Sequence, residues 1–108
     1  MRKLKHPRLD EMNLAEVLYA LGDPARLQIV TSLAELSPKI AHERSCKSVC
    51  QSLRLSKSTL SHHFKILREA GLIRCDKEGT QYVNHLRHED LQKRFPQLLN
   101  CILKAYKK

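Results

Sequence analysis

The residues best suited to do chemistry in this chain lie close together, in the segment S-K-S-T-L-S-H-H-F-K of residues 56–65. Their hydroxyl, imidazole and ammonium groups can donate hydrogen bonds to base acceptors and to phosphate oxygens. In a helix, Leu60, Phe64 and Leu67 would lie on one side, with His63 beside them and partly buried. The opposite side would carry Ser58, Ser61, His62 and Lys65. The segment therefore predicts a helix with an outward face suited to the major groove of DNA.

The two ends of this helix are marked by Ser56, which we expect to cap its start, and by Gly71. A helix N-terminus favours an anion, so we expect Ser56, Lys57 and Thr59 to hold DNA phosphates there. A shorter helix is predicted over 45–53, and a tight turn joins it to the start of this helix. Two helices joined in this way predict a helix-turn-helix, whose second helix enters the groove.

A β-hairpin is predicted next, because the segments L-I-R-C-D and T-Q-Y-V-N-H-L flank K-E-G. Arg74, Lys77 and Gln81 would sit in or beside its turn. There they would touch the sugar–phosphate backbone or the minor groove, which makes the hairpin a wing beside the reading helix. Hairpin tips are polar in most proteins, so these residues gain weight only together with the helix.

The remaining elements must hold this helix and hairpin in place. Asn13 begins an N-x-x-E capping box, Gly22 is expected in the left-handed conformation, and Asp23-Pro24 begins another helix. Pro96 divides the last helical segment. The expected elements are helices over 14–21, 24–36, 45–53, 57–70 and 88–107, and a hairpin over 72–86. They predict a mainly α fold with a β-hairpin wing, a winged helix-turn-helix with about five helices and two strands.

The overall charge points to the class of partner. Among 108 residues, 20 Lys and Arg stand against 11 Asp and Glu, which gives a net charge of +9. This excess favours a polyanion, with nucleic acid the first choice and an anionic membrane surface the second. No apolar run reaches the roughly 18 residues of a membrane-spanning helix, and no signal peptide is visible at the start. We therefore expect a cytoplasmic protein with no membrane partner.

Two parts of the chain are expected. Residues 1–12 form a basic N-terminal arm with Arg2, Lys3, Lys5 and Arg8, and residues 13–108 form the winged helix-turn-helix domain for DNA binding and dimerisation. A domain of about 100 residues buries only about two thirds of its unfolded surface, so a dimer would enlarge a thin core.

The segments Y-A-L-G-D-P-A-R-L-Q-I-V-T-S-L-A-E and L-S-K-S-T-L-S-H-H-F-K-I-L-R-E-A-G-L-I-R-C-D-K-E-G-T-Q-Y-V-N-H-L resemble the ArsR/SmtB family of bacterial winged-helix repressors. The likeness covers about residues 14 to 86. It implies a homodimer formed by the first and last helices on an inverted-repeat operator in double-stranded DNA. It also implies that residues 56–65 belong to the recognition helix, that residues 74–81 form the wing, and that an effector weakens DNA binding.

Neither metal site familiar in this family is preserved. Where the family's Cys-x-Cys pattern would fall, this chain has Ser45 and Lys47, and Cys50 alone matches a further position. The pattern of Asp and His in the last helix meets Arg87-His88-Glu89 and then residues 100–103, which cannot supply four ligands for zinc. We expect no metal and no cofactor.

The cysteines leave two interpretations open. Cys46 and Cys50 lie one helical turn apart, and Cys101 in the last helix would approach them if the helices pack together. They form either a thiol effector site or part of the core, since buried cysteine behaves as a small hydrophobe. A disulfide there requires Cα atoms within about 7 Å.

Catalysis is not expected. Ser61 and His62 are neighbours on a helix and point in different directions, so they cannot form a nucleophile–base pair. The sequence therefore predicts a dimeric DNA-binding repressor. The alternatives are a winged-helix module that docks an acidic protein, and a repressor with no metal or redox sensing.

Overall fold

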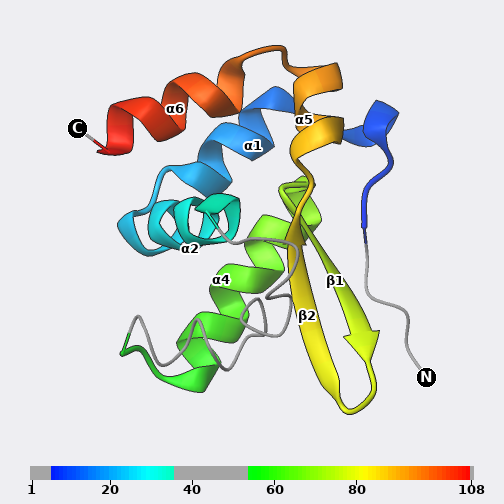
Figure 1. Cartoon of the computed structure of the whole chain (residues 1–108), viewed down its shortest axis with the longest axis vertical. Helices are drawn as coiled ribbons and strands as arrows, with labels where there is room; N and C mark the ends of the chain where they lie inside the picture. The colour runs from blue at the N-terminus through cyan, green and yellow to red at the C-terminus, as the bar shows by residue number, and fades with distance from the viewer. Residues whose placement is uncertain (1–5, 36–53, 108) are drawn as a thin grey trace.

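The computed structural model describes residues 6–35 and 54–107 (Figure 1). Within them the chain forms a short 3-10 helix, five α-helices and one antiparallel hairpin. The mainly α fold with a two-stranded wing is confirmed, whereas the 3-10 helix lies in the segment predicted as a basic arm. In chain order these are η1 (Leu9–Glu11), α1 (Leu14–Leu21), α2 (Pro24–Glu35), α4 (Lys57–Ala70), β1 (Ile73–Glu78), β2 (Gln81–Leu86), α5 (His88–Arg94) and α6 (Leu98–Lys107). The short helix expected over 45–53 lies outside the described residues. None of the described helices is long and apolar enough to cross a membrane.

The corner between α1 and α2 is built by side-chain caps. Asn13 Oδ1 accepts a hydrogen bond from Glu16 N at 3.2 Å, which caps α1 as predicted. Asp23 Oδ2 accepts from Ala25 N at 2.9 Å and from Arg26 N at 3.1 Å, which caps α2. Such caps satisfy backbone donors that a helix leaves without an internal partner.

The prediction that Gly22 adopts the left-handed conformation is wrong. Its φ is −82°, so the corner does not use the left-handed region. A glycine still suits the position, because an added Cβ would lie 3.3 Å from the carbonyl oxygen of Leu18. The close approach of α1's last turn, rather than a positive φ, restricts the side chain here.

Helix α4 begins and ends as predicted. Ser56 Oγ accepts from Thr59 N at 3.2 Å, and Gly71 has a φ of +95°. The left-handed glycine ends the helix and turns the chain into β1. Met12 lies against Gly71, and a Cβ added there would come within 2.9 Å of Met12 Cγ. The N-terminal segment and the end of α4 are therefore packed together.

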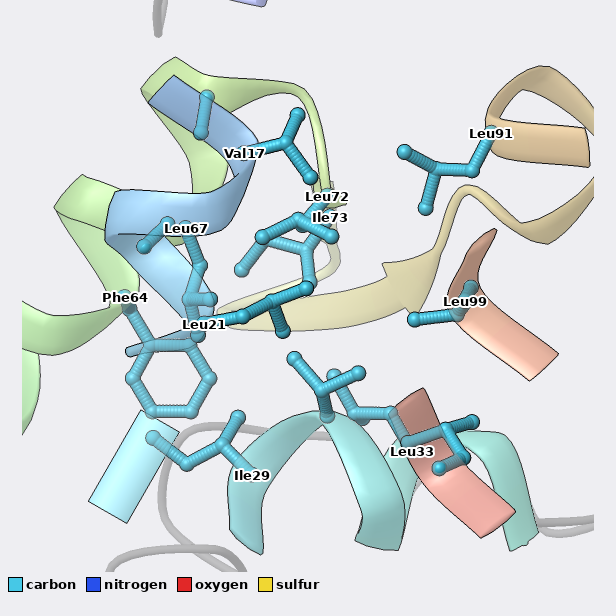
Figure 2. Close-up of a cluster of buried hydrophobic side chains, with 14 of the residues drawn as sticks. Val17, Leu21, Ile29, Leu33, Phe64, Leu67, Leu72, Ile73, Leu91 and Leu99 are labelled. Carbon is cyan, nitrogen blue, oxygen red and sulfur yellow. The ribbon is translucent and has the colours of Figure 1, made fainter. Parts of the chain in front are cut away.

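The core gathers between α4, α1, α2 and the C-terminal helices (Figure 2). Leu60, Phe64 and Leu67 are each at most 4% exposed, which confirms the predicted inward face of α4. Their partners in the cluster include Val17, Leu21, Ile29, Leu33, Leu72, Ile73, Leu91 and Leu99. Apolar side chains of α1, α2 and the chain that follows α4 thus hold one side of the helix in place.

The C-terminal helices are separated at Pro96, as predicted. Helix α5 ends at Arg94, Gln97 adopts a positive φ of 65°, and α6 begins at Leu98. Figure 1 shows α1 and α6 at one end of the molecule. The start of α4 and the tip of the hairpin lie at the other end.

Candidate nucleic-acid interface

The outward face of α4 carries the residues that the sequence places there. Ser58, Ser61, His62 and Lys65 are all exposed, opposite the buried Leu60, Phe64 and Leu67. These four side chains can offer hydroxyl, imidazole and ammonium donors to the edges of base pairs. The predicted geometry of this face is confirmed, and its contact with DNA stays a prediction.

The hydroxyls at the start of α4 are linked to one another. Ser56 Oγ donates to Thr59 Oγ1 at 2.8 Å and lies 3.3 Å from Ser58 Oγ. Lys57 is exposed beside them. The network fixes the hydroxyl orientations where the backbone amides and the helix dipole favour a phosphate.

The wing differs from the expectation in the place of Arg74. Arg74 pairs in register with His85, four positions before the end of β1, and its Nε lies 2.9 Å from Asp76 Oδ2. It therefore sits toward the base of the hairpin with a carboxylate partner, and not in or beside the turn. Gln81, the first residue of β2, does follow the turn. The sequence identifies the turn but not the register, which sets the distance of Arg74 from the tip.

Two wing residues near the tip share one face of the hairpin. Lys77 is directly opposite Tyr82, so both side chains point to the same side. Both are exposed, Tyr82 by 43%. The sequence interpretation includes Lys77 and misses Tyr82, which the strand alternation from Lys77 across a short turn would have indicated.

His63 is positioned as predicted, at the edge of the buried face. Its side chain is 13% exposed, and its Nδ1 lies 3.2 Å from Arg26 Nη1 and 4.0 Å from Asp23 Oδ2. Arg26 is itself buried, with 7% of its surface exposed. Burial alone raises the pKa of Asp23, but the backbone N–H of Arg26 and its guanidinium charge outweigh that effect and lower it. Sequence periodicity misses this cluster, because it treats arginine as a surface residue.

The described part of the expected basic arm is packed on the domain. Cys75 N donates to His6 Nε2 at 3.1 Å, and Arg87 Nη1 donates to Pro7 O at 2.7 Å. Met12 is 2% exposed and belongs to the core. Residues 6–12 therefore cover the edge of β1 and the end of α4, and residues 1–5 lie outside the described part.

The His6 contact predicts a pH-dependent attachment of this segment. Burial lowers the pKa of His6 below its ordinary 6.5, and the charges of Arg68 and Arg87 lower it further. The unfolded chain therefore binds more protons between the folded and the ordinary pKa. The contribution of His6 to stability is complete above pH 6.5 and is lost as the pH falls through the lowered folded pKa.

The measurement is the melting temperature of wild type and of His6→Gln between pH 8 and pH 5. Glutamine can accept from the Cys75 amide and does not titrate in this range, so the wild type should lose stability relative to the variant on acidification. Parallel curves would show that protonation of His6 does not act on this contact.

No group of three or more His, Cys, Asp and Glu side chains suited to a metal ion occurs among residues 6–35 and 54–107. Cys101 is exposed on α6 and Cys75 is half-buried on β1. Cys46 and Cys50 lie outside the described residues, so the thiol effector site stays a prediction.

A pocket of about 350 Å³ at the base of the wing includes Arg74 and Arg87. Both arginines already have a carboxylate partner, so we assign no ligand to it.

The end of the molecule opposite the wing tip carries uncovered apolar surface. Leu14 and Leu18 on α1 are each 46% exposed, and Leu98 and Ile102 on α6 are half-buried. Exposed apolar residues of this kind on adjoining helices are typical of a surface that another protein covers.

Known proteins similar to this chain share its sequence pattern and its fold. The model of the family described as bacterial regulatory protein, arsR family, matches residues 23–74. The uncharacterized HTH-type transcriptional regulator YceK of Bacillus subtilis is 38% identical over 94 residues, which cover 86% of this chain and 89% of the relative. The arsenical resistance operon repressor of Staphylococcus xylosus is 32% identical over 83 residues, covering 72% of this chain and 69% of the relative.

A solved structure extends the likeness to three dimensions. The homodimeric winged helix-turn-helix DNA-binding domain of a possible ArsR-family transcriptional regulator from Mycobacterium bovis matches with a TM-score of 0.66. The match covers 88% of this chain and 82% of that one at 24% identity. The predicted winged helix-turn-helix fold is confirmed.

Proposed function

Because this chain belongs to the ArsR family of bacterial regulatory proteins, we propose that it is a cytoplasmic repressor that binds an inverted-repeat operator as a homodimer. The observation that carries the proposal is the outward face of α4. Ser58, Ser61, His62 and Lys65 are exposed there, while the opposite face is fixed in the core. A rigid helix that presents short and cationic donors suits base recognition in the major groove.

The contacts divide by chemistry. We assign base or near-base contacts to the outward face of α4, and phosphate contacts to Ser56, Lys57 and Thr59 at its start. On the wing, Lys77 and Gln81 lie nearest the tip, and we add Tyr82 to them. Arg74 lies nearer the base of the wing, so it would contact the DNA sugar–phosphate backbone only where the duplex extends that far. The net charge of +9 supplies non-specific affinity that falls with salt.

We infer that α1 and α6 form the dimer interface. Their partly exposed apolar residues lie at the end of the molecule remote from the start of α4 and the wing tip (Figure 1). A two-fold dimer built there leaves both reading helices uncovered. Such dimers bind half-sites about one helical turn, roughly 34 Å, apart, which accounts for an inverted repeat.

The test begins with selection of binding sites from a randomised duplex pool by the wild-type protein. Lys65→Ala should weaken binding to the selected duplex by roughly tenfold or more, and binding to a scrambled duplex by much less, because a base contact carries sequence information. Lys93→Ala, which removes an exposed lysine from α5, serves as the matched control. Gel shifts at several salt concentrations provide the affinities.

Two results would overturn the proposal. Equal losses on both duplexes would make Lys65 a phosphate contact and remove the claim of specific reading by this residue. Failure of the wild type to enrich any sequence would favour the protein-docking module, which uses the same basic face for an acidic partner.

A further inference from the structure

We propose that Arg26 and His63 are positioning residues that set the orientation of α4 for DNA reading, although neither belongs to its outward face. The proposal rests on the proposed function. It starts from a buried guanidinium at the corner of α1 and α2. Arg26 Nε donates to Ala20 O at 2.6 Å and Nη2 donates to Tyr19 O at 3.4 Å. These carbonyls belong to the last turn of α1, where Tyr19 O also accepts from Gly22 N at 3.1 Å. The guanidinium supplies donors to carbonyls at a helix end, which lack the full set of intrahelical partners.

The third arm of the same guanidinium reaches α4. Arg26 Nη1 lies 3.2 Å from His63 Nδ1. Arginine has donors and no acceptor, so His63 Nδ1 must accept this hydrogen bond without a proton of its own. The guanidinium thus joins the end of α1, its own helix α2 and the middle of α4 in one hydrogen-bonded unit.

The position of His63 gives this unit its effect on DNA reading. His63 directly follows His62 and lies two residues before Lys65, both on the outward face. The apolar contacts of Leu60, Phe64 and Leu67 hold α4 against the core, but hydrophobic burial by itself has no preferred direction. A directional bond at the edge of this buried face fixes the rotation of α4 about its own axis, and with it the direction of the outward side chains.

The polar groups around His63 come from α2, from the corner before it and from α4 itself. Arg26 faces Nδ1 from α2, Asp23 Oδ2 lies 4.0 Å away at the corner, and the His62 ring is centred 6.2 Å away on α4 itself. Tyr19 on α1 lies under the Arg26 guanidinium, 5.5 Å from ring centre to Cζ. Removal of the Nδ1 acceptor would leave Nη1 of the buried Arg26 without this partner, and α4 would lose its hydrogen bond to α2.

Three variants test the pair. His63→Leu removes the acceptor and keeps an apolar body, and should weaken binding to the selected duplex by about tenfold or more. His63→Asn restores an acceptor close to the position of Nδ1 and should stay within about twofold of wild type at pH 8. His88→Asn, which changes an exposed histidine on α5, is the control for a general effect of replacing a histidine by asparagine.

The decisive readout is the ratio of His63→Asn to His63→Leu affinity for the selected duplex at pH 8. Both variants remove the imidazole, but only asparagine restores an acceptor, so His63→Asn should bind about tenfold or more tightly than His63→Leu. Equal affinities of the two variants would overturn the proposal. So would a His63→Leu protein whose folded fraction binds as well as wild type.

A separate measurement does not require DNA. Ring nitrogen–proton correlations by NMR should show His63 with its proton on Nε2 and Nδ1 as acceptor at pH 8, and a protonated Nδ1 under these conditions would overturn the pair. If the tautomer is as expected and no duplex is ever enriched, the proposed function fails while the Arg26–His63 contact stands.

Discussion

Replacement of Phe64 by alanine is expected to reduce the free energy of unfolding by about 3–5 kcal/mol, the usual cost of removing a buried aromatic ring. Phe64 is 4% exposed and lies among Leu21, Ile29 and Leu67 (Figure 2). Each kcal/mol corresponds to about 4–8 °C in melting temperature for a domain near this size. The variant should therefore melt at least 12 °C below wild type, or fail to fold at 37 °C.

The size of this effect follows from the position of Phe64 on the reading helix. It has the same core face as Leu60 and Leu67, so a cavity there removes the apolar support of the outward residues. Tyr82→Ala removes an aromatic ring that is 43% exposed and should change stability by no more than about 0.5 kcal/mol. Thermal and urea unfolding of the three proteins provide the comparison. Similar losses for both variants would mean that α4 is not fixed mainly by its buried face.

Leu18→Glu is expected to give a monomer that binds the selected duplex at least a hundredfold more weakly than wild type. Leu18 is 46% exposed on α1, beside Leu14, in the surface that we propose as the dimer interface. A carboxylate placed there loses its water on association and leaves a buried charge without a partner. A monomer keeps only one reading helix, so it loses the joint binding of two half-sites.

Gln28→Glu adds the same charge at an exposed position of α2 and serves as the matched control. Light scattering after gel filtration reports the mass in solution, gel shifts report affinity, and circular dichroism reports the fold. A Leu18→Glu protein that remains a dimer with full affinity would place the interface elsewhere. A variant that unfolds calls for Leu18→Gln, which tests the same surface without a charge.

Much of the local structure could be predicted because each signal is contained within a few residues. The spacing of Leu60, Phe64 and Leu67 indicates the buried face of α4 by helical periodicity alone. Gly71 and Pro96 mark helix boundaries through their own backbone restrictions. These predictions need no knowledge of which elements meet in space.

The parts that the sequence did not predict depend on contacts between distant segments. Arg26 is buried because the carbonyl ends of α1 converge on it, and periodicity has no means of showing that. The sequence predicts Arg74 in or beside the turn, but the strand register puts it near the base of the wing. The charge of residues 1–12 indicated an arm and hid the burial of Met12 against Gly71.

The attachment of the N-terminal segment to the hairpin also bears on how the protein behaves at high concentration. A hairpin of two strands exposes backbone groups along its edges, to which a strand from another molecule can add. On β1 the Cys75 amide is already bonded to His6, and the adjacent Pro7 has no N–H to offer an incoming chain. The segment therefore occupies part of this edge, which hinders the addition of a strand from another molecule and so opposes aggregation. This effect is separate from any contact with nucleic acid.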